Sequence, residues 1–230
     1  MGADISGRLL RRYKRFFADV QTDRGDEITV HCPNPGSMRG CLEIGAAVRC
    51  TTSDNPRRKL RHTLEMIRLG RVWVGLHTLR ANQLAAGVLE NAGVAALGGY
   101  SDLQREVPVG EGTRLDFRLT GHPREPDAYV EVKSVTMAEG TCARFPDSVT
   151  ARGRRHAERL EGLARSGLRA AVLFVVQRGD CERVEPADDL DPEYGAALRR
   201  AARHGVELYA VRARVGPQRL RVDRELPVCL

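Results

Sequence analysis

The stretch RAAVLFVVQ, residues 169–177, leaves few choices for the structure around it. Strands that are buried on both faces are continuously apolar, because helices cover both sides of the sheet that contains them. Helices are predicted at 150–165 and near 191–204, on either side of this run, and a further strand is predicted at 206–213. This order predicts an α/β unit in the C-terminal part of the chain.

The first 76 residues have a different pattern. Short β-like runs alternate there with turn signals, which is typical of a small all-β barrel or sandwich. A helix is predicted over about 78–97 despite its internal glycines, and strand-like segments follow at 103–109, 114–120 and 128–135. We therefore expect an α/β protein, α+β overall, in which a small β-barrel precedes a domain with a mixed sheet.

Basic charge is concentrated in the N-terminal part. The chain has a net charge of +7, from 37 Lys plus Arg and 30 Asp plus Glu. Residues 1–97 contain 15 and 9 of these, giving +6, whereas residues 98–230 contain 22 and 21, giving +1. Two clusters hold much of the excess, RRYKR at 11–15 and RRKLR at 57–61, and aromatic residues accompany the first cluster.

These two clusters are typical of a surface that binds a flexible polyanion. Arginine and lysine attract phosphates, and aromatic rings offer surfaces on which unpaired bases stack. A solvated basic surface above an aromatic core fits the same pattern, and the sequence leaves this alternative open. The predicted nucleic-acid contacts in this part are Arg11, Arg12, Lys14, Arg57, Arg58 and Lys59.

A predicted hairpin, RLDFRLTGHPREPDAYVEVKSVT at 114–136, carries charged residues within its strands. Asp116 lies on the first strand, and Glu131 and Lys133 lie two residues apart on the second, so these two share a face. The simpler interpretation is the wet side of a surface hairpin. Lysine use argues against it. Only Lys14, Lys59 and Lys133 are lysines among the 37 basic residues, so a merely solvated cation at position 133 would be expected to be arginine.

Asp116 and Glu131, which meet across the hairpin, form a candidate site for a hard divalent metal. Mg²⁺ typically takes one or two carboxylates and keeps waters and phosphate oxygens as its other ligands. Lys133 could orient or deprotonate an attacking water, or counter charge on a reacting phosphate. We predict Asp116, Glu131 and Lys133 as catalytic residues, Glu106 as an additional ligand or acid, and Mg²⁺ or Mn²⁺ as the cofactor.

The sequence shows no feature of a membrane or secreted protein. No stretch approaches the roughly 20 apolar residues that span a bilayer, and no continuous apolar run follows the basic N-terminus. The six cysteines form no C-x-x-C pair and no zinc spacing. We expect reduced thiols, a cytoplasmic location and no membrane partner.

Longer motifs are spread over nearly the whole chain. They are RRYKRFFADV, HCPNPGSMRG, TSDNPRRKLRHT, GTRLDF, YVEVKSVT, FPDSVTARGRRH, GVELYA and the terminal LPVCL. The acid–acid–lysine pattern resembles that of the PD-(D/E)XK, or restriction-endonuclease-like, superfamily, and the motifs together resemble the sugar fermentation stimulation protein family. The resemblance implies an OB-fold-like domain at 1–80, a nuclease-like domain at 81–230, and nucleic-acid binding. The family name records a sugar-metabolism phenotype that is attributed to a DNA-binding regulator.

Five charged residues match the family pattern: Glu106, Arg114, Asp116, Glu131 and Lys133. Arg114 is therefore added to the predicted nucleic-acid contacts. Two positions depart from the pattern: Pro35 stands where threonine is more usual, which removes a hydroxyl and a backbone donor, and His77 stands where asparagine is more usual. Both lie in the N-terminal part, so they concern ligand contacts there rather than the predicted metal site.

The motif FPDSVTARGRRH leads into the predicted helix at 150–165. Asp147 and Thr150 are typical of a turn and an N-cap. Basic side chains then recur at steps of three or four residues and would share one helical face: Arg152, Arg155, His156 and Arg159. A phosphate-binding face and a solvated helix surface both fit, and the first three of these residues are among the predicted contacts.

These features together predict a nucleic-acid-binding protein with an Mg²⁺-dependent phosphodiesterase site. DNA is the expected partner and RNA the alternative, and Gln177, at the end of the apolar run, is a further candidate for the active site. The rival prediction is a non-catalytic, DNA-binding transcriptional regulator of sugar metabolism that retains the fold. Clustered carboxylates beside phosphates favour the enzyme, because without a metal they only repel the ligand. The oligomeric state is not predicted.

Overall fold

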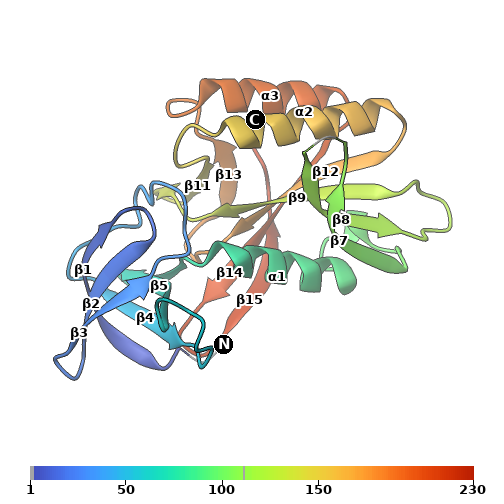
Figure 1. Ribbon diagram of the computed structural model, residues 1–230. Helices are drawn as coiled ribbons and strands as arrows, with labels where there is room; N and C mark the ends of the chain where they lie inside the picture. Colours follow the sequence, from blue (N-terminus) through green and yellow to red (C-terminus); the bar gives the residue numbers. More distant parts are fainter. Residues whose placement is uncertain (1–2, 111) are drawn as a thin grey trace.

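The computed structural model describes residues 3–110 and 112–230. Within these ranges the chain forms a β-barrel at its N-terminus and a larger mixed sheet with helices on both faces (Figure 1). The last barrel strand ends at Gly75 and the first helix begins at Thr78. The predicted domain boundary between residues 80 and 81 stays a prediction. No helix in the described ranges is long and apolar enough to cross a membrane.

The barrel is formed by the first strands of the chain: β1 (Ile5–Tyr13), β2 (Phe17–Thr22), β3 (Glu27–His31), β4 (Ala47–Thr52) and β5 (His62–Leu69), extended by β6 (Val72–Gly75). They pair in the order β3-β2-β1-β4-β5-β6, and a further pairing between β3 and β5 closes the ring. Closure leaves the barrel with few unpaired edges. The predicted small N-terminal barrel of OB type is confirmed.

Apolar side chains of these strands fill the barrel. Leu9, Val20, Val30, Leu64 and Ile67 are completely buried in one apolar cluster. Buried and more exposed positions alternate in β1 and β4, whereas β5 is buried continuously over residues 63–67. At Gly7 a Cβ atom would lie 2.3 Å from the carbonyl oxygen of Gln21, so only glycine allows β1 and β2 to approach this closely. The apolar alternation and this close crossing explain why the short β-like runs form a barrel.

The larger sheet has the strand order β15-β14-β12-β9-β8-β7. Its strands are β7 (Asp102–Pro108), β8 (Arg114–Thr120), β9 (Ala128–Val135), β12 (Arg169–Val176), β14 (Glu207–Val215) and β15 (Leu220–Leu226). The central strands β9, β12 and β14 are parallel, and the outer strands are antiparallel to their neighbours. All residues of β12 from Ala170 to Val176 are buried, as the apolar run predicted.

Helices cover both faces of this sheet, with α1 (Thr78–Glu90) on one side and α2 (Ala151–Arg165) and α3 (Pro192–Arg203) on the other (Figure 1). The prediction of one helix over about 78–97 was too long. Ala92 has a φ of +51°, and the amide of Gly93 donates to the carbonyl of Val88 (2.7 Å), which ends the helix in a left-handed turn. A short 3₁₀ turn, η1 (Ala95–Leu97), follows.

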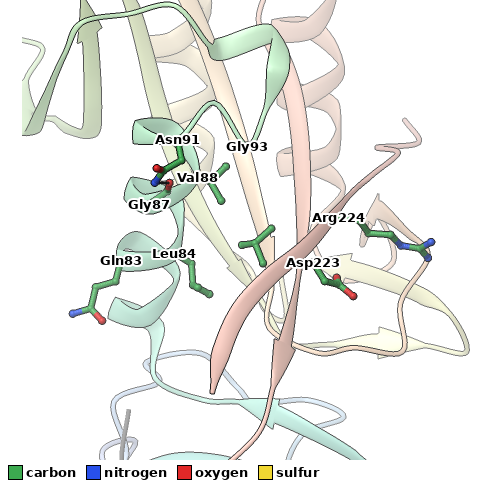
Figure 2. Close-up of a pocket in the computed structure, with 9 residues that line it drawn as sticks. Gln83, Leu84, Gly87, Val88, Asn91, Gly93, Asp223 and Arg224 are labelled. Atoms are coloured by element: carbon green, nitrogen blue, oxygen red, sulfur yellow. Dashed lines mark hydrogen bonds between the residues drawn. The ribbon is translucent and has the colours of Figure 1, made fainter. Parts of the chain in front are cut away.

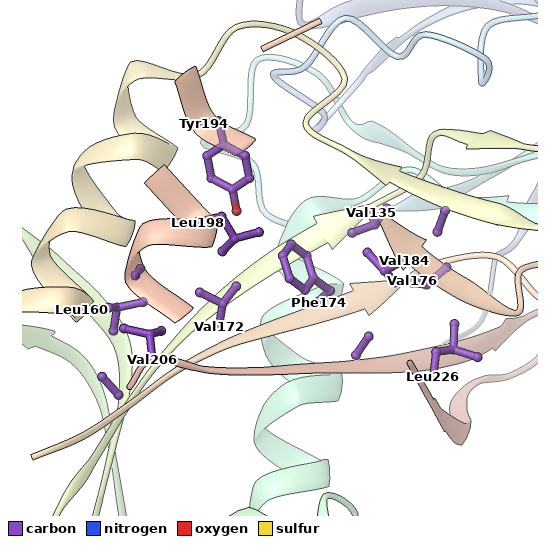
Figure 3. Close-up of a cluster of buried hydrophobic side chains, with 14 of the residues drawn as sticks. Val135, Leu160, Val172, Phe174, Val176, Val184, Tyr194, Leu198, Val206 and Leu226 are labelled. Carbon is purple, nitrogen blue, oxygen red and sulfur yellow. The ribbon is translucent and has the colours of Figure 1, made fainter. Parts of the chain in front are cut away.

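The apolar cluster beneath α2 and α3 fixes these helices on the sheet. Tyr194 and Leu198 of α3 and Leu160 of α2 pack on Phe174 of β12 and Val135 of β9 (Figure 3). A small sheet of β10 (Ala138–Glu139), β11 (Cys142–Phe145) and β13 (Arg183–Pro186) borders the cluster. The N-cap predicted at Thr150 is confirmed, because its hydroxyl accepts from the amide of Gly153 (3.0 Å). These contacts hold the first turns of α2 above β9.

Direct hydrogen bonds tie the barrel to the larger sheet. The amide of Gly75 donates to the carbonyl of Gln177 (2.8 Å), and the hydroxyl of Thr78 donates to the carbonyl of Pro33 (3.0 Å). Asp147, predicted as a turn residue, accepts from the amide of Met38 in the barrel loop (2.8 Å). The loop that contains the HCPNPGSMRG motif is thereby held against the start of α1 and the loop between β11 and α2.

Candidate functional site

The predicted acidic residues lie where β8 and β9 separate. The last recorded backbone pair between these strands joins Phe117 to Val130. Beyond it, the carboxylate of Asp116 takes the place of the neighbouring backbone, because its Oδ2 accepts from the amide of Val132 (2.7 Å). Its Oδ1 accepts from the side-chain amide of Asn82 on α1 (2.6 Å). Asp116 is therefore held between a strand and a helix, with its position fixed from both sides.

Glu131 is buried on the face of β9 that α2 covers. Its Oε1 accepts from Nζ of Lys133 (2.8 Å) and also contacts Nδ1 of His156 on α2. Its Oε2 is buried and has no hydrogen-bond partner within residues 3–110 and 112–230. A buried ionised oxygen without a partner is costly in free energy. This atom is therefore the unsatisfied part of the site.

The pKa values of the two acids are shifted in opposite directions. Burial, with the nearby charge of Glu131, raises the pKa of Asp116 to about 6, despite its hydrogen bonds from Val132 and Asn82. Burial also acts to raise the pKa of Glu131, but the charge of Lys133 and the contact with His156 outweigh it and hold this pKa below its ordinary value. At neutral pH the site thus holds negative charge that Lys133 balances only in part.

Both acids line a cleft of about 630 Å³ between the barrel and the larger sheet. Arg15 and the loop at 34–36 border it from the barrel side. Leu79 and Asn82 border it from α1, and Arg152 borders it from α2. The acids therefore lie in a space that both folded parts enclose, and two exposed arginines border that space.

Two further hollows adjoin this cleft. One, of about 570 Å³, is lined by Arg114, Arg152 and Arg155, and it shares Arg152 with the cleft. The other, of about 440 Å³, lies on the barrel and shares Pro35 and Leu79 with the cleft. Because they share these lining residues, the three hollows lie next to one another, in order from the barrel past the acids to α2. We use the term track for these three hollows below.

Comparison with known families identifies the kind of protein that carries this track. Residues 79–219 match the family described as the sugar fermentation stimulation protein RE domain, and residues 10–76 match the SfsA N-terminal OB domain. The chain belongs to the sugar fermentation stimulation protein (SfsA) family. The family and the two domain types that the motifs predicted are confirmed.

Individual SfsA-family proteins match over almost the full chain. A sugar fermentation stimulation protein homolog of Geobacter sulfurreducens is 47% identical over 223 residues, which cover 97% of this chain and 95% of the relative. A homolog of Thermosynechococcus vestitus is 45% identical over 215 residues, covering 92% and 89%. The solved structure of Pyrococcus furiosus SfsA in complex with Ca²⁺ superposes with a TM-score of 0.89 at 26% identity, and the match covers 100% of this chain and 98% of that chain.

Glu106, the third acid of the predicted metal site, is not brought into the cleft. It is exposed on β7, and in the ladder it falls opposite Asp116, between the pairs Arg105–Phe117 and Val107–Leu115. Its φ of +52° interrupts the extended strand there. Glu106 lines the arginine-rich hollow instead. Among the described residues, no group of three or more His, Cys, Asp or Glu side chains is arranged to hold a metal.

Two of the predicted phosphate contacts on the barrel have internal partners. Nε of Arg11 donates to Asp19 (2.6 Å), a buried acid of β2. Arg12 donates to the carbonyls of Arg15 (2.8 Å), Asn34 (3.0 Å) and Gly36 (2.9 Å). Arg12 therefore shapes the two loops that border the cleft.

The other predicted barrel contacts remain open to a ligand. Lys14, Arg57 and Lys59 are exposed. Arg58 is half-buried and donates to the hydroxyl of Thr63 (2.7 Å) on the wall of the barrel hollow. These side chains lie in the loops after β1 and β4, which are the loops that OB-folds use for oligonucleotides.

The predicted basic face of α2 is divided by the structure. Arg152 and Arg155 are exposed and line the arginine-rich hollow beside Arg114. His156 is 5% exposed, and its ring contacts Glu131 instead of solvent. Nε of Arg152 donates to Nε2 of His156 (3.4 Å), so a hydrogen bond links the exposed arginine to the buried histidine.

Sequence reasoning missed Asn82 and the role of His156. Asparagine has a low helix propensity because its side chain can hydrogen-bond to the nearby backbone, and apart from Thr78 at the start it is the residue of this kind in the predicted helix segment TLRANQLAAG. That signal could have marked Asn82 as a functional position. Gln177 was predicted near the active site, but it is fully buried at the junction with the barrel, where its amide donates to Ser134 (2.9 Å).

Another hollow, of about 440 Å³, lies between α1 and β15 (Figure 2). It is lined by apolar parts of α1, including Leu84 and Val88, and by Asp223 and Arg224. Asp223 accepts hydrogen bonds from Arg212 and Arg214, so its charge is already balanced. This hollow shares no lining residue with the track and is not included in the candidate site.

Proposed function

We propose that this protein binds nucleic acid along the track and cleaves a phosphodiester bond with Mg²⁺ or Mn²⁺ held by Asp116 and Glu131. One observation carries the proposal. Oε2 of Glu131 is buried without a hydrogen-bond partner among the described residues, and the charge of Glu131 helps to raise the pKa of Asp116. A divalent cation between the acids would satisfy the free oxygen and relieve the repulsion.

The residues present fit a hard cation. Asp116 and Glu131 supply carboxylate oxygens, which Mg²⁺ prefers. The carbonyl of Val132 is a third candidate ligand, because the N–H and C=O of one strand residue lie on the same edge and the N–H of Val132 faces Asp116. Val132 also lines the cleft. The Pyrococcus furiosus relative solved with Ca²⁺, another oxygen-seeking ion, supports divalent-metal binding in this family.

The chain's own residues have defined roles in this proposal. A bound Mg²⁺ supplies charge stabilisation at a phosphate oxygen and makes water more acidic. Lys133, buried against Glu131, offers a compact cation that can position the attacking water or counter developing charge. Asn82 and the Val132 amide hold Asp116, and His156 holds Glu131. Glu106, which lies outside the cleft, is left with no direct role in holding the metal.

The nucleic acid would be held mainly through its phosphates. Arg15 and Arg152 border the cleft, and Arg114 and Arg155 continue the basic surface beyond it. Each contact releases counterions from the polyanion, which makes affinity depend on salt. DNA is the proposed partner and RNA the alternative, because both present this phosphate backbone to the track.

The test combines metal binding with cleavage. In wild type, Mn²⁺ at about 100 times its Kd should stabilise the fold by about 2.7 kcal/mol and raise the melting temperature. Labelled single-stranded DNA, duplex DNA and RNA should be cut with Mg²⁺ or Mn²⁺ and not with EDTA. Glu131→Gln should lose both responses. Glu90→Gln, an exposed acid of α1 outside the cleft, is the matched control and should keep them.

The outcomes separate the proposal from its rival. An equal metal response in wild type and Glu131→Gln would remove the metal assignment. Tight binding of an oligonucleotide by wild type, with no cleavage of any substrate, would favour the non-catalytic DNA-binding regulator.

A further inference from the structure

The barrel hollow has a lining different from that of the acidic cleft. Its volume is about 440 Å³, and its walls combine rings with hydroxyl and imidazole groups: Phe16, His31, Thr51, Thr63 and His77. We call it the barrel pocket. Small-molecule pockets of this size typically combine an apolar surface with a few polar groups that fix orientation.

The outer wall of the barrel pocket is aromatic. Phe16 lies in the turn between β1 and β2, and 41% of it is exposed. Its ring centroid is 6.3 Å from that of His31, with the two planes 30° apart. The guanidinium of Arg15 lies 6.0 Å from the centroid of the Phe16 ring. An exposed phenylalanine beside a second ring and a cation offers a platform on which a base can stack.

The inner wall carries unused hydrogen-bonding capacity. Nδ1 of His77 is buried and has no partner among the described residues. The hydroxyl of Thr63 accepts from Arg58 (2.7 Å), so its own hydrogen remains free to donate. Burial lowers the pKa of His31 and of His77, which keeps both rings neutral at pH 7. Neutral imidazoles suit the edges of bases better than they suit phosphates.

The floor of the barrel pocket is formed by a hydrogen-bonded acid and adjoins the cleft. Glu65 of β5 is 2% exposed, and its two oxygens accept from Arg80 of α1 (3.0 and 3.2 Å). Thr51 also donates to Glu65 (2.9 Å). Because this carboxylate is internally paired, it does not repel a ligand. The pair also fixes the barrel relative to α1, and Leu79 in the first turn of α1 lines both the pocket and the cleft.

We propose that the barrel pocket receives one unpaired nucleobase of a strand whose neighbouring phosphate lies in the acidic cleft. Phe16 and His31 stack on the base, and Thr63 and His77 bond to its edge. A base that is still paired and stacked cannot enter such a pocket, so the substrate presents an unpaired base at the site of cleavage, from a single-stranded stretch or flipped out of a duplex. This inference rests on the proposed function and specifies its substrate class.

The test separates base binding from phosphate binding. Fluorescence anisotropy in EDTA compares oligothymidylate of about 12 nucleotides, within the site sizes of OB-folds, with a strand of equal length and charge in which every base is absent. Wild type should bind the base-containing strand about tenfold more tightly. Phe16→Ala should remove most of this difference and leave the affinity for the abasic strand unchanged. Ile44→Ala, another exposed apolar residue of the barrel, should change neither.

Edge recognition is tested by comparing oligomers of adenine, cytosine and thymine. Thr63→Val and His77→Ala should change the order of their affinities without affecting the abasic strand. Equal affinity of wild type for base-containing and abasic strands, or an equal loss on both strands in Phe16→Ala, would overturn the pocket and leave the proposed function standing. No binding of wild type to any strand would overturn both.

Discussion

The barrel and the larger sheet use their arginines in opposite ways. On the larger sheet and its helices most arginines are paired with acids, as in Arg169–Glu207, Arg199–Asp188 and Arg212–Asp223. On the barrel the described ion pairs are few, and in two of them, Arg11–Asp19 and Arg80–Glu65, the acid is buried. The charge difference between +6 and +1 in the two parts of the chain thus reflects how many cations are left free for a ligand.

This contrast shows where the protein can attract a polyanion. Paired arginines hold loops and strands together, and their field is largely cancelled at a distance. Within the C-terminal part, Arg114, Arg152 and Arg155 are exposed without acidic partners in the described structure, and these three line the track. We therefore assign strand binding to the unpaired cations along the track. We assign cleavage to the buried cluster of Asp116, Glu131 and Lys133 within it.

The largest expected effect is on the rate of cleavage, with strand affinity nearly unchanged. Lys133→Ala should slow cleavage by about 100-fold or more, because loss of a general base or an electrostatic stabiliser typically costs that much. Affinity for an intact strand in EDTA should change little, since one buried cation among many exposed ones contributes a small share. Single-turnover cleavage and anisotropy measure the two quantities separately.

Lys133→Arg gives the sharper control. Arginine keeps the charge but is larger and does not deprotonate, so it should not rescue cleavage in a site where Lys133 is only 9% exposed. Full activity in Lys133→Arg would mean that position 133 needs only a positive charge. Cleavage that survives in Lys133→Ala would remove the residue from the mechanism.

The next effect is on binding alone. Replacement of Arg57, Arg58, Lys59 and Arg61 by Ala should weaken oligonucleotide affinity by roughly 10- to 100-fold at low salt. Arg61 lies 3.8 Å from Asp54, but both side chains are exposed, so this pair is screened and weak. The replacement should also flatten the slope of log affinity against log salt by up to about 3, because fewer counterions are released from a single strand. The measurement is an anisotropy titration at several salt concentrations.

The matched control removes equal charge from the paired set. Its four substitutions to Ala are at arginines that each bind an acid: Arg183, Arg199, Arg214 and Arg224. Because these cations are already neutralised, their loss should leave the salt slope nearly unchanged. If both quadruple variants lose the same affinity, net charge alone matters, and the distinction between free and paired arginines is wrong.

Much of the fold followed from local patterns. The apolar run at 169–177 predicted a covered strand, and the short β-like runs within the first 76 residues predicted a small barrel or sandwich, of which the barrel is observed. The end of α1 was wrong because a left-handed residue at Ala92 stops a helix whose apolar pattern continues to Leu97. Local propensity does not reveal such a turn when alanine rather than glycine occupies it.

The candidate site was only partly accessible to the same reasoning. Alternation placed Glu131 and Lys133 on one face, and the structure joins them by a hydrogen bond. Glu106 does not line the cleft, and its φ of +52° is a feature that no sequence pattern signals. Pro35 and His77, the two departures from the family motifs, both line the barrel pocket, and this became visible only when the chain was folded.

Two adjacent residues of α2 provide a third test. His156 is buried and contacts the proposed metal ligand Glu131, whereas Arg155 is exposed and lines the arginine-rich hollow. His156→Leu removes a donor to Glu131, so metal affinity should fall by about tenfold while oligonucleotide affinity in EDTA is retained. Arg155→Leu should do the reverse. Calorimetry with Mn²⁺ and anisotropy read the two effects. A loss of strand affinity alone in His156→Leu would return His156 to the phosphate-binding face that the sequence predicted.

The smallest expected effect is a pH dependence of metal affinity in the acidic cleft that strand affinity on the barrel does not share. Burial and the charge of Glu131 raise the pKa of Asp116 to about 6, so below that pH a proton occupies the carboxylate that the metal needs. Metal affinity should therefore be constant above about pH 7 and should fall by up to about tenfold for each pH unit below 6. The arginines of the barrel stay charged throughout, so they add no pH dependence to strand affinity in EDTA. Calorimetric Mg²⁺ titrations at pH 5, 6, 7 and 8, beside anisotropy in the same buffers, measure both. Metal affinity that stays constant from pH 5 to 8 would show that Asp116 is not a ligand. Glu131 would then be the one carboxylate ligand left in the proposed metal site.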